Sequence, residues 1–222
     1  MLQKTLRNSL WLVLVLALAN CIVWSKIPAA EESQVTISVH NDAGIPFGIL
    51  LEAESEASGV FRQSGIAVRW LNCPLTAASP ENARQCAAAE FPRHLQLRIA
   101  KRSLNLNEFT MGISYLSADG TGCYADLFYN RAQFIHETSQ ISLATILGHA
   151  MAHELGHLLL GTNSHAPTGL MRARWQTDDL ARASKGRLVF STLESQVMQN
   201  KLAAWHAQGR EDSLTTAAHL GN

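Results

Sequence analysis

The stretch that decides the fold is residues 149–175, which read HAMAHELGHLLLGTNSHAPTGLMRARW. Its centre is the motif HELGH, in which His153 and His157 flank Glu154. A helix turns by about 100° per residue, so histidines four positions apart lie on one face and can direct two imidazole nitrogens at a single metal ion. Glu154 lies beside them, where its carboxylate can reach a metal-bound water without binding the metal, as a general base must. The motif therefore predicts a catalytic zinc site on a helix.

A third ligand is needed, because catalytic zinc sites use three protein ligands and keep a further position for water. Gly161 follows the last leucine of the helix and suits a left-handed cap that turns the chain back towards the metal. His165 is then the natural third ligand. Further on, Met171 is expected to form a tight turn under the metal, with Gly169 easing the bend.

These residues resemble the metzincin peptidases, most closely their matrixin-like branch, whose signature is H-E-x-x-H-x-x-G-x-x-H followed by a methionine turn. This chain departs from the signature in spacing, since it reads H-E-x-x-H-x-x-x-G-x-x-x-H. Arg172 follows Met171, so the tyrosine that some metzincins place just after the methionine is absent. The resemblance implies an α+β domain in which a mixed twisted sheet of about four to five strands lies against a backing helix and a central zinc-binding helix.

Three functions compete on this evidence. The leading one is a secreted zinc-dependent endopeptidase, in which Zn²⁺ activates a water and polarises the scissile carbonyl while Glu154 moves the proton to the leaving amine. The second is a metzincin-like binding module that has lost turnover. The third is a zinc hydrolase whose third ligand is a carboxylate, for which Glu194 is the nearest downstream candidate.

The helix that carries the motif is expected to begin near Gln140, after a capping residue at 138 or 139, and to end at Leu160. It is apolar nearly all round and should lie in the middle of the protein. His149 is one turn before His153, but three ligands on successive turns would span about 12 Å of helix axis. We therefore expect His149 to be a buried histidine with a hydrogen-bond partner.

Residues 1–30 have the composition of a secretory signal or an N-terminal anchor. Lys4 and Arg7 precede an apolar run from Leu10 to Ala19. The longer stretch from Leu10 to Trp24 is still shorter than the roughly 20 residues that span a bilayer. Cys21 ends a weak lipoprotein box, so cleavage, lipidation and retention of the leader all stay open. We expect export to the cell envelope or beyond, with membrane contact only through this segment.

Composition indicates a single catalytic domain over residues 31–222, with a mobile tail from about residue 209. The formal net charge is zero and no block of Lys or Arg occurs, so no nucleic-acid partner is expected. We expect the protein to be a monomer that acts on a peptide or protein substrate. Cys73 and Cys86 bracket a polar loop and are expected to form a disulfide, which leaves Cys123 over.

Alternating apolar residues predict strands at 35–39, 66–71, 95–99, 111–116 and 124–129. A helix from Pro46 to Gly65 joins the first two strands as a right-handed parallel crossover. A short helix should follow residue 177 and end near 186, and a final helix should run from 191 or 192 through Trp205. The resemblance implies that residues 111–116 form an antiparallel edge strand that binds an extended peptide, with a plain core hairpin as the alternative.

Overall fold

The computed structural model describes residues 33–73, 84–86, 94–102 and 110–220, with side chains described as far as residue 208. The expected leader, residues 1–30 with Cys21, lies outside this part of the chain. Five strands form one sheet in the order β2-β1-β3-β5-β4, and every neighbouring pair is parallel except β4 with β5. The strands are β1 (Ser33–Asn41), β2 (Ile66–Cys73), β3 (His94–Ala100), β4 (Gly112–Tyr115) and β5 (Tyr124–Phe128). The expected α+β fold with a mixed sheet is confirmed.

The first crossover is β1, α2 (Phe47–Gln63) and β2. Pro46 stands at the N-cap of α2 with φ −53°, a value that the proline ring fixes and that suits the start of a helix. Gly65 has φ +68°, the left-handed conformation that turns the chain from the helix into β2. Strands β1 and β2 pair in parallel, with Val35 opposite Val68, so the expected crossover unit is confirmed.

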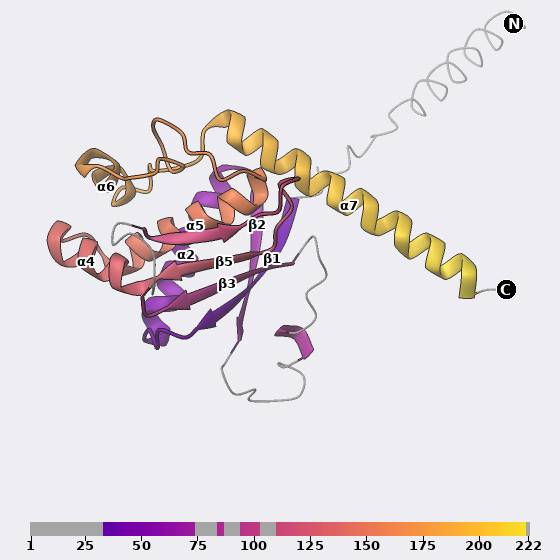
Figure 1. The fold of residues 1–222 in the computed structure, drawn as a ribbon, viewed down its shortest axis with the longest axis horizontal. Coiled ribbons are helices and arrows are strands. Elements are labelled where there is room, and N and C mark those ends of the chain that lie inside the picture. Colours follow the sequence, from indigo (N-terminus) through magenta and orange to yellow (C-terminus); the bar gives the residue numbers. More distant parts are fainter. Residues whose placement is uncertain (1–32, 74–83, 87–93, 103–109, 221–222) are drawn as a thin grey trace, which may run out of the picture. The chain divides into compact units, whose positions relative to one another are not determined.

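The core lies between one face of the sheet and two helices, α2 and α5 (Leu143–Leu160), which Figure 1 shows behind the strands. Alternate residues of β1 and β3 are fully buried on this face: Val35, Ile37, Val39, Leu95, Leu97 and Ile99. Helix α5 is buried along nearly its whole length. Its position in the middle of the protein follows from its apolar surface, because an all-round apolar helix is stable only when other elements cover every side.

The chain between β5 and α5 contains a helix where no element was expected. Helix α4 (Tyr129–Ser139) follows β5 directly, and its C-cap residue Gln140 has a left-handed φ of +60°. Helix α5 then begins at Leu143 instead of near residue 140. Only Ala132 of α4 is buried, so the sequence of this helix has almost no apolar periodicity from which it could be predicted.

Two further helices complete the chain, α6 (Thr177–Ala183) and α7 (Thr192–Leu220). Helix α7 continues through Gly209, where we expected a tail to begin. A glycine inside a helix costs about 1 kcal/mol relative to alanine and does not by itself end the helix. Lys201 of α7 donates hydrogen bonds to the carbonyl oxygens of Leu158 at 3.0 Å and Gly120 at 3.3 Å. These contacts hold α7 against the end of α5 and the loop between β4 and β5.

A disulfide joins Cys73, the last residue of β2, to Cys86, with a Cα–Cα distance of 5.8 Å. The thiol of Cys123 is free. Among the helices that the structure describes, none combines the length and the apolar character needed to cross a membrane.

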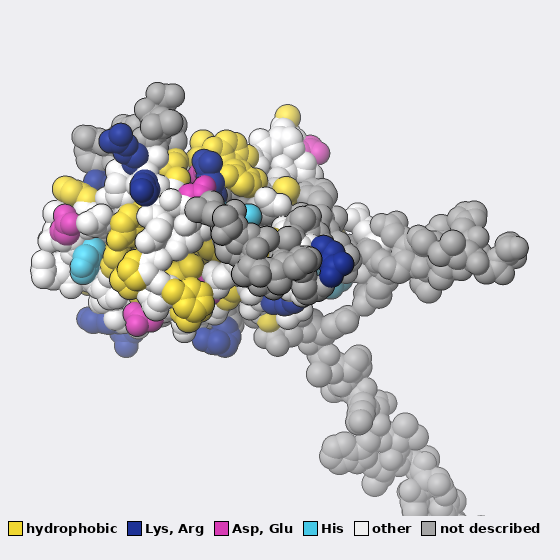
Figure 2. Space-filling model, turned by 90° about the horizontal axis from the view of Figure 1, so that it is seen from below, with side chains coloured by type: hydrophobic (Ala, Val, Ile, Leu, Met, Phe, Trp, Pro, Cys, Tyr) yellow, Lys and Arg dark blue, Asp and Glu magenta, His cyan; other side chains and the backbone are white. Residues whose placement is uncertain are grey.

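Hydrophobic side chains reach the surface in Figure 2 among scattered Lys, Arg, Asp and Glu. The large ones that are most exposed come from four different elements: Phe47 and Leu51 of α2, Tyr115 of β4, Phe134 of α4, and Leu193 and Val197 of α7. The exposed apolar surface is therefore divided among several elements.

Candidate metal centre and its cavity

Three histidines come together at the end of α5. The ligand nitrogens of His153, His157 and His165 all lie within 4.8 Å of one another. The first two are buried on α5 and the third is exposed on the following loop. Gly161 caps the helix with φ +71° and donates its N–H to the carbonyl oxygen of His157 at 2.9 Å, which turns the chain back. The loop therefore brings His165 to the pair on the helix despite its longer spacing.

Backbone carbonyls fix how the two buried imidazoles are oriented. The Nδ1 atom of His153 lies 2.8 Å from the carbonyl oxygen of Leu170, and that of His157 lies 2.8 Å from the carbonyl oxygen of Thr162. A carbonyl can only accept, so each Nδ1 carries the proton and each Nε2 of the neutral ring offers a lone pair. This arrangement, in which the outer ring nitrogen donates to a carbonyl, is typical of metal-binding histidines.

The two Nε2 atoms, of His153 and His157, lie 3.1 Å apart and face each other. Two lone pairs repel at this distance unless a proton or a cation lies between them. Two nitrogens bound tetrahedrally at the usual zinc–nitrogen distance would be about 3.3 Å apart. The residues present therefore fit a zinc ion, and the three-histidine cluster could bind one.

Burial keeps these rings neutral, which is the form that binds a metal. Desolvation lowers the pKa of His153 to about 3, with a smaller contribution from the neighbouring His157. Desolvation also lowers the pKa of His157 and of His165. All three imidazoles consequently retain their lone pairs at neutral pH.

Met171 lies in a tight turn that packs against α5. Gly169 has φ +83°, and the N–H of Arg172 donates a hydrogen bond to the carbonyl oxygen of Gly169 at 3.3 Å. Met171 is 1% exposed and lies under α5 at Gly156, where an added Cβ would come within 2.9 Å of the methionine sulfur. The turn also presents the Leu170 carbonyl that holds His153.

Glu154 is buried next to the histidines, with 5% of its surface exposed. The hydroxyl of Ser114, on β4, lies 2.9 Å from Glu154 Oε2 and 2.7 Å from the Glu154 carbonyl oxygen. Burial raises the pKa of Glu154 to about 7, and the hydrogen bond from Ser114 opposes the rise. A carboxyl group with a pKa near neutrality can both accept and return a proton.

A cavity of about 550 Å³ opens beside the cluster and is lined by His153, Glu154 and His165. Its other walls come from three segments: the start of β4, helix α4 and the chain after the methionine turn. Among the lining residues are Met111, Gly112, Phe134, Ile135, Arg172 and Trp175. The wall that α4 provides was not expected from the sequence, because α4 itself was not.

Trp175 and Ser114 are contacts of the site that sequence reasoning missed. The indole N–H of Trp175 donates to the Leu170 carbonyl oxygen at 3.0 Å, and its ring lies edge-on to that of His153 at 6.1 Å. The alternation of side chains along a strand shows which residues share a face of the sheet with Ser114. It does not show that this face of the sheet packs against Glu154.

Two candidate residues lie outside the cluster. His149 is fully buried, and its Nδ1 lies 2.8 Å from the carbonyl oxygen of Thr145, so it has the hydrogen-bond partner that we expected. Glu194 accepts a hydrogen bond from the N–H of Ser191 at 2.6 Å and thereby caps α7. The carboxylate considered as an alternative third ligand is therefore engaged elsewhere.

No family model matches this sequence, and no curated protein is detectably similar to it. A zinc-dependent peptidase from Methanocorpusculum labreanum has a similar structure, with a TM-score of 0.50 and 18% identity over 73% of this chain and 99% of that one. The archaemetzincin of Methanopyrus kandleri gives 0.47 and 17% identity, over 79% and 99%. Metalloproteinase-II from Bacteroides fragilis gives 0.47 and 12%, over 77% and 54%. The first of these similarities shows that the two chains share a fold.

Proposed function

We propose that this protein is an exported zinc-dependent endopeptidase of metzincin type, acting as a monomer on peptide or protein substrates. The observation that carries the proposal is the cluster of three histidine nitrogens within 4.8 Å, set beside a buried glutamate on the wall of one cavity. A zinc ion held there would supply Lewis acidity, which activates water and polarises a peptide carbonyl.

The protein's own residues would divide the remaining work. His153 and His157 are held for binding by the carbonyl oxygens of Leu170 and Thr162, and His165 completes the set from the loop. Glu154 would accept a proton from the attacking water and deliver it to the leaving amine. Burial raises the pKa of this carboxyl group, which makes it a stronger base for the water proton.

Strand β4 is the candidate for binding the substrate backbone. Among the described strands it lies at the edge of the sheet and pairs with β5 alone, and its first residue, Gly112, lines the cavity. An extended peptide can add to such an edge by backbone hydrogen bonds, with side chains entering the neighbouring cavity. Substrates would then be extended segments, as a peptidase requires.

The test combines zinc analysis with hydrolysis of fluorescein-labelled casein. We expect one zinc per chain in the wild-type protein, retained in Glu154→Gln, while the hydrolysis rate of that variant falls by about 10²- to 10⁴-fold. Glu52→Gln is the matched control, since Glu52 is an exposed glutamate on α2 and its amide should leave hydrolysis unchanged. A protein without zinc, or undiminished hydrolysis by Glu154→Gln, would contradict the proposal. Zinc without any hydrolysis would favour the binding module instead.

A further inference from the structure

We infer that Ser114 is a positioning residue for Glu154, whose hydroxyl holds one carboxylate oxygen and leaves the other for proton transfer. The inference rests on the proposed role of Glu154. Ser114 is 4% exposed on β4, and both acceptors within reach of its hydroxyl, Oε2 at 2.9 Å and the carbonyl oxygen at 2.7 Å, belong to Glu154. The hydroxyl therefore addresses one residue only, the one that would act as the base.

The second oxygen of that carboxylate is left open. Within the described part of the chain, Glu154 Oε1 has no hydrogen-bond partner, although Glu154 lines the cavity. A hydrogen bond to one oxygen also removes rotamer freedom from the side chain, so the remaining oxygen is held in a defined direction. This asymmetry is what a base aimed at a single water needs.

The strand that carries Ser114 is shaped around the same side chain. Gly112 precedes Ser114 by two positions, so both residues face α5. A Cβ at Gly112 would lie 2.6 Å from Glu154 Cγ and Cδ, and 2.6 Å from the Asp126 carbonyl oxygen. Strand β4 thus leaves space for the Glu154 side chain at Gly112 and provides a hydrogen-bond donor to it at Ser114.

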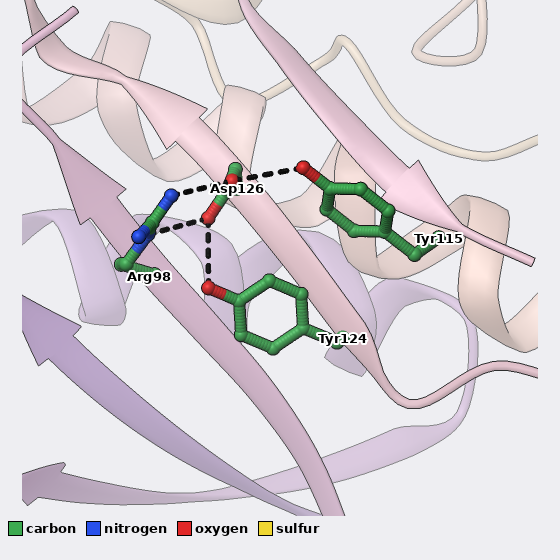
Figure 3. A network of polar contacts seen from close by, with 4 residues as sticks. All are labelled: Arg98, Tyr115, Tyr124 and Asp126. Atoms are coloured by element: carbon green, nitrogen blue, oxygen red, sulfur yellow. Dashed lines mark hydrogen bonds and ion pairs between the residues drawn. The ribbon is translucent and has the colours of Figure 1, made fainter. Parts of the chain in front are cut away.

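A polar network on the opposite face of the sheet fixes β4 in place (Figure 3). The hydroxyl of Tyr115 donates to Asp126 Oδ2 at 3.0 Å, and that of Tyr124 donates to Oδ1 at 3.0 Å. Arg98 binds both oxygens of the same carboxylate at 2.8 Å. An edge strand has a ladder on one side only, so this attachment to β3 and β5 defines where Ser114 stands.

The test compares Ser114→Ala with Ser114→Thr, which keeps a hydroxyl. The control is Ser58→Ala, which removes a partly buried hydroxyl that accepts a hydrogen bond from Trp70 of β2, at the other edge of the sheet. The probe is a quenched fluorescent peptide selected from a random library by cleavage with the wild-type enzyme. We expect Ser114→Ala to lower kcat by about 10- to 100-fold with KM within about twofold of wild type and zinc content unchanged. Ser114→Thr should recover most of kcat, and Ser58→Ala should not lose it.

A second measurement needs no turnover. In the zinc-loaded protein, the infrared carboxyl bands of Glu154 are identified by their loss in Glu154→Gln. We expect these bands to shift in Ser114→Ala and to stay in place in Ser58→Ala, because only the first variant removes a hydrogen bond to that carboxyl group.

The outcomes separate this inference from the proposed function. Unshifted bands together with wild-type kcat in Ser114→Ala would overturn the inference, as would equal loss of kcat in the Ala and Thr variants. A wild-type protein that cleaves no peptide contradicts the proposed function and leaves the infrared comparison to decide the inference.

Discussion

In the described part of the chain, burial raises the pKa of two glutamates to about 7, and their surroundings differ. Glu154 accepts a hydrogen bond from Ser114 and lines the cavity beside the histidines. Glu54, on α2, is 4% exposed; among the described residues it accepts only a long hydrogen bond of 3.4 Å from Asn72, and its Oε1 has no partner there. Its burial therefore weakens the folded state wherever the carboxyl group is ionised.

The first prediction concerns the pH dependence that Glu54 introduces. Burial raises its pKa from 4.5 to about 7, so the folded state binds the proton more tightly than the unfolded chain does. This contribution to the free energy of unfolding is fully present below pH 4.5 and is lost as the pH rises towards 7. In Glu54→Gln, we expect this fall in the free energy of unfolding between pH 4.5 and 7 to be absent. Above pH 7 the variant should be more stable than the wild type. Urea unfolding at several pH values checks it, with Glu52→Gln as the exposed control; parallel wild-type and Glu54→Gln curves would contradict it.

The second prediction identifies the third ligand. His165→Ala should lower zinc affinity by more than about 100-fold, a loss beyond that typical of residues that merely support a ligand. Glu194→Ala should leave zinc affinity unchanged, because that carboxylate caps α7 at Ser191. Competition with a fluorescent zinc chelator measures both. The reverse pattern, with affinity lost in Glu194→Ala alone, would replace the three-histidine site with a carboxylate-ligand site.

At the scale of elements, the sequence predicted those parts whose apolar residues repeat. The five strands and α2 lie where alternation and helical spacing indicated them, because one face of each packs on the core. Helix α4 was not predicted because Ala132 is its only buried residue, which leaves no apolar repeat. No turn residue separates it from the preceding strand either, since β5 ends at Phe128 and α4 begins at Tyr129. The motif predicted which residues could bind zinc, but not the wall of the cavity, which depends on how α4 packs beside α5.

The third prediction concerns the contact between α2 and α5. Gly148 lets the helices approach closely, since an added Cβ would lie 2.5 Å from the Ala53 carbonyl oxygen and 2.5 Å from Glu56 Cβ. Gly148→Ala should destabilise the protein by about 1–3 kcal/mol, as overpacking in a core usually does. Gly59→Ala is the matched control on α2, where the nearest atom to an added Cβ is the flexible end of Arg62 at 3.7 Å.

In the control, alanine gains helix propensity without a clash, so Gly59→Ala should stabilise by up to about 1 kcal/mol. Denaturant unfolding distinguishes the two signs. Equal effects of the two substitutions would show that helix propensity, and not the helix contact, governs both positions.

At the scale of the whole molecule, the histidine cluster joins two segments of the chain. His165 belongs to the loop beyond Gly161, whereas His153 and His157 belong to the central helix. The loop continues into the methionine turn and then into α6, which α5 touches. A metal bound to all three histidines would therefore tie the C-terminal part of the chain to the core.

The last prediction is that zinc stabilises the entire fold. An ion that binds the folded state alone adds about 2.7 kcal/mol when its free concentration is 100 times the Kd. For a chain of this size each kcal/mol raises Tm by roughly 2–4 °C. Removing zinc with a chelator should then lower Tm by about 5–11 °C, and restoring zinc should reverse the change. In His165→Ala, removing zinc should change Tm very little, because this substitution removes the zinc ligand that links the loop to α5. In Glu194→Ala, removing zinc should lower Tm as much as in the wild type. A shift of equal size in both variants would mean that the ion is held by α5 without the loop, and that the loop's position does not depend on the metal.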